Sequence, residues 1–200
     1  MNLNSVLNMV SAALLAAAAA IGVFYLLHFL RYRSGKLAHI KVSNALKRFG
    51  IIRNYKVLEN LHLRCGKHEA QIDCMLVGFF GILLVNAVND TAEYYGDAGG
   101  KQWVKVMKGQ RSEMENLCAK NLRDIELLRE IFAKNNVYGI QIEGLVVFCG
   151  NMKKTIFGIT GAQGLMNFKR FKSYLGKSKF EKDNDVDVPG LTELILKYQV

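Results

Sequence analysis

The sequence predicts an α/β protein in which helices flank a mixed sheet and a single apolar helix precedes the folded domain. Three observations predict this class. Residues 5–30 form an apolar run without Lys, Arg, Asp or Glu; residues 55–85 contain three strand-like stretches; residues 113–150 read as a long helix and then a buried strand. Strands grouped early and followed by helix, strand and helix are typical of an α/β sandwich with a mixed sheet.

The apolar run is long enough for a membrane anchor, because about 20 apolar residues cross a bilayer. A cleaved signal peptide is the alternative. It typically has a positively charged start, a shorter apolar stretch and a small-residue cleavage site, whereas this chain starts MNLNS and its run ends in bulky residues before RYRSGK. Cations follow the run and none precede it, so we expect a single-pass anchor with the N-terminus outside and residues 31–200 in the cytoplasm.

Composition divides the chain into four predicted segments. They are a transmembrane anchor (1–30), a basic juxtamembrane helix (31–54), an α/β domain (55–182), and an acidic linker with a terminal helix (183–200). Apolar spacing predicts the helix within the second segment at 36–49, ended by Gly50.

Periodicity predicts the elements of the α/β domain in order. Strands are expected at 55–63, 68–78 and 80–85, a polar Gly-rich loop at 90–101, a strand at 102–107, a helix at 113–135 and a parallel strand at 142–150. The second and third strands should form a hairpin around Gly78 and Gly81. Strict alternation in the second would place Ile72 and Cys74 on one face and Asp73 and Met75 on the other.

The charge and the cysteines limit the partners and cofactors. The net charge of +10 belongs to the part after the anchor, and a basic domain beside a membrane can bind anionic lipid or nucleic acid. The four cysteines lack C-x-x-C spacing, which argues against zinc, and a cytoplasmic location argues against disulfides. We expect them to be small, buried or half-buried residues.

A basic segment between residues 150 and 180 interleaves cations with aromatic residues. Its candidate nucleic-acid or lipid contacts are Lys153, Lys154, Lys169, Arg170, Lys172 and Lys177. Such a segment can neutralise phosphates and stack on bases, or lie on an anionic membrane as an amphipathic helix. Alternatively, Phe168, Phe171 and Leu175 pack on the sheet while the cations stay solvated.

The order of segments resembles the nuclease-related domain (NERD) family. The matching pieces are a basic helix, YKVLENLHL, QIDCMLVGFFGILLVN, a Gly-rich loop, Trp103 and a helix with MENLCAKNL, over residues 35–150. The resemblance implies a restriction-endonuclease-like fold. It also implies a nuclease site in which an Asp of the second strand and a Glu of the third hold Mg²⁺, beside a Lys two residues after that Glu.

Of the three residues that the resemblance expects on the second and third strands, this sequence has only the Asp. Asp73 matches the Asp, but Asn86 stands at the Glu and Val88 at the Lys. His39 falls on the Glu of a Gly-Glu pair in the preceding helix, and Lys120 on the Gln of an Asn-Pro-x-x-Gln pattern at Asn116–Lys120. Mg²⁺ dehydrates reluctantly and needs anionic ligands, so we predict a vestigial pocket with no bound metal or other cofactor.

The predicted role is binding or scaffolding at the cytoplasmic membrane face, with nucleic acid as the partner that the resemblance implies. One alternative is a Mg²⁺-dependent nuclease that uses Asp73 with substitute ligands. Another is a structural module attached to anionic lipids or to another membrane protein.

Overall fold

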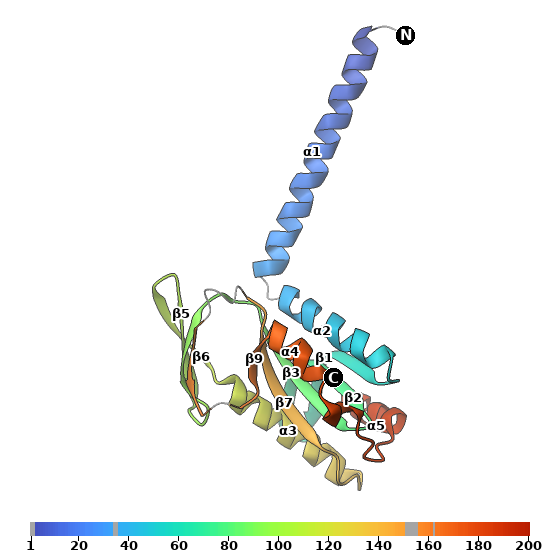
Figure 1. The fold of residues 1–200 in the computed structure, drawn as a ribbon, viewed down its shortest axis with the longest axis vertical. Helices are drawn as coiled ribbons and strands as arrows, with labels where there is room; N and C mark the ends of the chain where they lie inside the picture. The colour runs from blue at the N-terminus through green and yellow to red at the C-terminus, as the bar shows by residue number, and fades with distance from the viewer. Residues whose placement is uncertain (1–2, 34–35, 151–155, 162) are drawn as a thin grey trace. The chain divides into compact units, whose positions relative to one another are not determined.

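The computed structural model describes residues 3–33, 36–150, 156–161 and 163–200 (Figure 1). The chain divides into two compact units, Met1–Leu37 and Ala38–Val200. The first unit contains helix α1 (Leu3–Arg33). Its stretch Ala13–Leu30 has a mean hydropathy of 2.2 and is not buried, so this helix is long and apolar enough to cross a membrane.

The main sheet of the second unit is mixed, as predicted. Among the described residues it has the strand order β1-β2-β3-β7-β9. These strands are β1 (Lys56–Cys65), β2 (His68–Gly78), β3 (Gly81–Val88), β7 (Ile142–Phe148) and β9 (Leu165–Asn167). The predicted β2–β3 hairpin is antiparallel and β7 runs parallel to β3. Gly81 has φ 122°, and a Cβ there would lie 2.3 Å from the Gln141 carbonyl oxygen, so the turn requires glycine.

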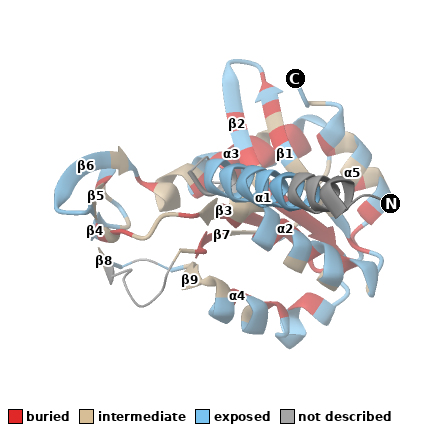
Figure 2. Ribbon diagram, turned by 90° about the horizontal axis from the view of Figure 1, so that it is seen from above, coloured by how far each residue is buried: buried red, intermediate tan, exposed pale blue. Residues whose placement is uncertain are grey.

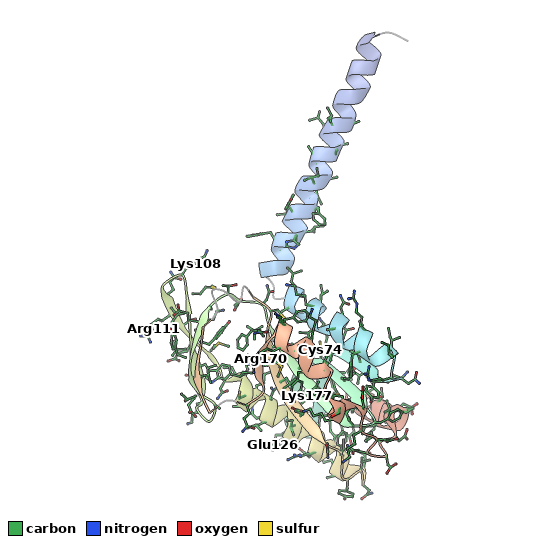
Figure 3. All side chains as sticks on the ribbon, viewed as in Figure 1. Cys74, Lys108, Arg111, Glu126, Arg170 and Lys177 are labelled. Atoms are coloured by element: carbon green, nitrogen blue, oxygen red, sulfur yellow. The ribbon has the colours of Figure 1, made fainter. Side chains whose placement is uncertain are left out.

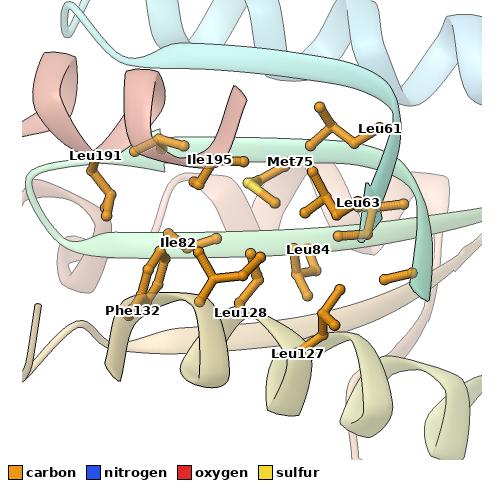
Figure 4. Close-up of a cluster of buried hydrophobic side chains, with 14 of the residues drawn as sticks. Leu61, Leu63, Met75, Ile82, Leu84, Leu127, Leu128, Phe132, Leu191 and Ile195 are labelled. Atoms are coloured by element: carbon orange, nitrogen blue, oxygen red, sulfur yellow. The ribbon is translucent and has the colours of Figure 1, made fainter. Parts of the chain in front are cut away.

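Helices cover both faces of this sheet (Figure 1). Helices α3 (Leu117–Lys134) and α5 (Val188–Leu196) pack on one face, where Leu84, Leu128 and Ile195 belong to one buried cluster (Figure 4). Helix α2 (Lys36–Ile51) and α4 (Phe168–Leu175) pack on the other, where Val42 and Phe171 are fully buried. A short 3₁₀ helix, η1 (Ser178–Glu181), follows α4. Both α2 and α5 therefore belong to the compact unit that contains the sheet.

A second sheet packs against residues of β7 and has the order β6-β5-β4-β8 among the described residues. Its strands are β4 (Glu93–Asp97), β5 (Gln102–Met107), β6 (Gln110–Glu115) and β8 (Ile156–Thr160). Tyr94 and Trp103 are buried with Phe148 of β7, whereas the β5–β6 turn is exposed (Figure 2). The apolar contacts of Tyr94 and Trp103 hold this sheet on the main one.

Two predictions in this region are wrong. The expected loop at 90–101 contains β4, and the expected helix start at 113 lies in β6. Helix α3 begins instead at Leu117, because the Asn116 side chain caps it by accepting from the backbone N–H groups of Cys118 (2.9 Å) and Ala119 (3.2 Å).

Strict alternation along β2 is also wrong. Ile72 packs on the α3 face, but so does Met75, while Cys74 packs on the α2 face. The change of face occurs at Asp73, opposite Asn60 of β1, which has a left-handed φ of 51°. The irregular backbone of Asn60 interrupts the β1–β2 ladder there, and Asp73 is the residue at the interruption.

Candidate functional site

Asp73 lies where strands β2 and β3 separate. The last pair of their ladder toward this end is Cys74–Val85. Beyond it, the Asp73 carboxylate accepts a hydrogen bond through Oδ2 from the backbone N–H of Ala87 at 2.9 Å. The carboxylate thus takes over the role of a ladder carbonyl, which gives it a structural contact at the position that the resemblance assigns to metal binding.

His39 reaches the same place from helix α2. Its Nε2 lies 2.9 Å from the backbone oxygen of Asp73, and a carbonyl can only accept, so Nε2 carries the proton and donates. This contact ties α2 to β2 at the interruption of the ladder. The hydrogen bond uses the backbone carbonyl of Asp73, so His39 makes no contact with the Asp73 carboxylate through it.

Lys120 reaches the site from the first turn of α3. Its ammonium donates to the Gln71 carbonyl oxygen, lies 3.4 Å from Asn86 Oδ1 and pairs with Asp124 Oδ2 at 2.7 Å. The amide nitrogen of Asn86 donates in turn to Asn121 Oδ1 at 2.5 Å. The structure therefore brings Lys120 and Asn86 into direct contact, and Asp73 joins them through the Asn86–Ala87 peptide.

Asn121 and Asp124 complete this cluster, although the sequence analysis did not single them out. Both are buried on α3, whereas the neighbouring Leu122 is 60% exposed. The sequence did contain a signal. Steps of four residues back from Ile125 and Leu128 reach 121 and 124, so two polar residues continue the buried stripe of the helix.

The electrostatics of the cluster are dominated by burial. Burial raises the pKa of the Asp124 carboxyl, and the adjacent Lys120 ammonium lowers it by less. The exposed fractions of the Lys120 and Asp124 side chains are 19% and 6%. Since the pKa of Asp124 is raised, the fold favours its neutral form, and this ion pair depends on Lys120 for its stability.

Val88 is half-buried and packs against the core. Strand β3 alternates regularly, so Ile82, Leu84, Asn86 and Val88 share the α3 side. The Val88 side chain packs in the cluster that contains Trp103 and Phe148. A lysine there would place its aliphatic stem among these rings, and no charged group replaces it on β3.

Asn116 and Trp103 act on the Gly-rich loop. The fully buried Asn116 amide donates to the carbonyl oxygens of Ala98 (2.9 Å), Gly100 (2.5 Å) and Asp97 (3.3 Å). The Trp103 indole also donates to the Asp97 carbonyl, at 3.1 Å. Trp103 is thus a core residue that anchors the loop, and Asn116 joins this loop to α3.

The donor atoms of the site do not fit Mg²⁺. The described residues contain no group of three or more His, Cys, Asp or Glu side chains that could hold a metal. The Lys120 ammonium lies 3.4 Å from Asn86 Oδ1, the oxygen at the position where the resemblance expects a Glu. A divalent ion bound to that oxygen would meet this positive charge, and the second carboxylate of the cluster, Asp124, is already paired with Lys120.

The cysteines offer no nucleophile at this end of the sheet. Burial raises the pKa of Cys74 to about 12 and that of Cys149 to about 11. Both thiols therefore remain protonated near neutral pH. All four cysteines are free, and three of them are buried.

The predicted basic contacts lie on and after α4. Lys169, Arg170 and Lys172 are exposed on this helix, and Lys177 follows it; Figure 3 labels Arg170 and Lys177. Phe171 and Leu175 bury the opposite side of α4 in the core. Lys153 and Lys154 lie outside the described residues. Helix α4 therefore packs on the sheet through its apolar side, as the last of the three interpretations of this segment expected. Its cations stay exposed and available to a ligand.

Comparison with known proteins identifies a family. The model of the nuclease-related domain family, NERD, matches residues 34–149. No curated protein and no solved structure matches the chain. The matched region covers more than half of the 200 residues and includes His39, Asp73, Asn86 and Lys120. The chain therefore belongs to the nuclease-related domain family.

Proposed function

We propose that this protein is a membrane-tethered NERD protein that does not cleave phosphodiesters and acts by binding or scaffolding. Its apolar helix α1 is the tether. The family's nuclease relationship makes nucleic acid one partner of the basic domain, and the orientation rule for flanking cations places this domain in the cytoplasm.

One observation carries the proposal: the Lys120 ammonium bonds to Gln71, Asn86 and Asp124, beside the Asn86 oxygen that stands where the resemblance expects a metal-binding Glu. A nuclease of this type needs a cation that polarises the phosphate and activates water. The Lys120 ammonium is fully engaged within the protein, since its three donors match its three acceptors. It stabilises the cluster and leaves no anionic pair for Mg²⁺.

A plasmid nicking assay tests the proposal. The full chain in detergent is incubated with supercoiled plasmid and Mg²⁺ or Mn²⁺, beside Asp73→Ala as the matched variant. We expect the same absence of nicking in both. Cleavage by the wild type that Asp73→Ala abolishes would overturn the proposal, whereas cleavage that persists in Asp73→Ala comes from a contaminating nuclease.

A divergent nuclease is the second candidate, and one observation favours it. The Lys120 ammonium reaches Asn86 from α3. It thereby supplies a lysine to the site, where valine stands at position 88 of β3 in place of the expected lysine. In such an enzyme, Lys120 would position the attacking water and Asp73 would provide the charged oxygen. Lys120→Met distinguishes the two candidates, because only an enzyme would lose nicking activity with it.

A further inference from the structure

A groove with a volume of about 510 Å³ lies between helices α2 and α4. Four cations line it: Lys41, Arg48, Arg53 and Lys172. Its other lining residues are Asn44, Ala45, Phe49, Phe168, Leu175 and Gly176, so no carboxylate lines it. A concave surface with one sign of charge concentrates ions of the opposite sign, so this groove selects an anion.

Most of this charge is free to bind a ligand. Arg53 pairs with Glu181 at 2.8 Å and lies over the Phe49 ring. No carboxylate among the described residues pairs with Lys41, Arg48 or Lys172, and the Lys172 ammonium lies 5.6 Å from the centre of the Phe168 ring. Three cations are therefore without a counter-ion among the described residues.

Apolar groups adjoin the cations. Phe49, Phe168 and Leu175 line the groove itself. Ile51 and Ile52, which lie in the chain between Phe49 and Arg53, are 77% and 81% exposed. Such exposed aliphatic residues gain nothing from a nucleic acid phosphate, but they gain from acyl chains.

The chain also favours a lipid ligand. Lys41 follows Leu30, the last residue of the apolar stretch of α1, by eleven positions. A groove so close in sequence to a membrane span meets headgroups at a high effective concentration. Nucleic acid has no comparable tether.

We propose that the groove between α2 and α4 binds the phosphate headgroup of an anionic phospholipid. Lys41, Arg48 and Lys172 contact the phosphate, and the aromatic residues with Ile51 and Ile52 contact the acyl region. This inference rests on the membrane tether of the proposed function and is independent of whether the Asp73 cluster is catalytic.

A lipid titration tests the inference with the full chain in a neutral detergent. Short-chain phosphatidylglycerol is compared with short-chain phosphatidylcholine, and bound lipid is counted by native mass spectrometry. The groove variant is Lys41→Gln/Arg48→Gln/Lys172→Gln. The matched control, Lys101→Gln/Lys108→Gln/Arg111→Gln, removes the same charge from exposed positions near β5 and β6. Figure 3 labels Lys108 and Arg111.

We expect the wild type and the control to bind phosphatidylglycerol, and the groove variant to bind it about tenfold or more weakly, since each cation near an anionic headgroup contributes substantially. Thermal unfolding should be the same for both variants because all six positions are exposed. Equal binding of the two lipids, or an equal loss in the control, would overturn the inference.

Two competitors sharpen this result. If glycerol phosphate binds as tightly as phosphatidylglycerol, the acyl contacts are absent and the groove is a phosphate site without lipid preference. If the groove variant loses binding of a single-stranded oligonucleotide while it keeps phosphatidylglycerol, the groove serves nucleic acid. Either outcome refutes the lipid assignment. Neither bears on the nicking assay, so the two proposals fail separately.

Discussion

The Asp73 cluster and the groove between α2 and α4 both collect charged side chains, but they differ in what those side chains contact. In the cluster, Lys120 bonds to Gln71, Asn86 and Asp124. In the groove, Lys41, Arg48 and Lys172 have no described carboxylate as partner. One site satisfies its polar groups internally, and the other leaves them for something outside the protein.

The difference teaches where stability and binding are located in this domain. A polar group whose hydrogen bonds are complete stabilises the fold and has little left for a ligand. Cations held near one another without counter-ions contribute little to folding and gain when an anion arrives. Substitutions should therefore change stability at the cluster and binding at the groove.

The largest effect is expected from Lys120→Met. It leaves the buried Asp124 carboxylate without its cation, which should reduce the free energy of unfolding by about 3 kcal/mol. Denaturant titration of the full chain in detergent measures this loss. The double variant Lys120→Met/Asp124→Leu should recover most of it, because no buried charge remains; a double variant as unstable as the single one would contradict this account.

The same variant should respond to pH. Burial raises the pKa of Asp124 in the fold, and a raised carboxyl pKa favours the folded state as pH falls through it. Protonation removes the unpaired charge of Lys120→Met, so its deficit relative to wild type should shrink on acidification. A deficit that stays constant from neutral pH to the onset of acid unfolding would show that Asp124 is not its cause.

Asn116→Ala should cost about 2 kcal/mol of stability, since it removes a helix cap and leaves carbonyls of the Gly-rich loop unbonded. Thermal unfolding provides the measurement. Asn116→Ser is the comparison variant, because its neutral hydroxyl can still cap α3 while the amide donors to the loop are lost. An effect as large for Ser as for Ala would assign the whole contribution to the loop.

At the groove, Ile51→Asn/Ile52→Asn should leave unfolding unchanged and weaken phosphatidylglycerol binding about fivefold, because two exposed side chains no longer enter the acyl region. Leu122→Asn is the matched control, since Leu122 is an exposed aliphatic residue on α3. Unaltered lipid binding in the double variant would limit the contact to the headgroup.

The smallest effect is expected at a third cluster, which is charged and paired but exposed. Hydrogen bonds from Lys134 and His68 lower the pKa of Glu130 to about 2 from the ordinary 4.5. Its stabilisation is therefore present above pH 4.5 and is lost as pH falls toward 2. Glu130→Gln should slightly reduce the pH dependence of the free energy of unfolding in that window. An unchanged pH dependence would show that solvent completely screens the interaction of Glu130 with Lys134.

Much of the fold could be predicted because its signals are local. The β2–β3 hairpin, the parallel strand β7 and the packing of α4 through Phe171 follow from periodicity and turn residues. Strand β4 could not be predicted, because its residues pair with β5 and with the distant β8 and have little periodicity of their own. The start of α3 depended on the cap at Asn116, which apolar spacing does not reveal.

The candidate site divides in the same way. Asp73, Asn86 and Val88 could be placed in advance because a single strand or hairpin fixes their positions. The contact of Lys120 with Asn86 could not, because it joins α3 to β3. The groove was not predicted at all: Lys41 and Lys172 are separated by 131 positions in the chain and meet only when α2 and α4 pack on the same face.

The sequence by itself determined the apolar helix, the class of fold and the hairpin that carries Asp73 and Asn86, because each is a property of one residue type or of a short repeating pattern. Only the tertiary structure decided that Lys120 bonds to Asn86, that Asn121 and Asp124 are buried, and that cations from two helices share a groove. These facts depend on contacts between segments far apart in the chain, and local periodicity carries no information about them.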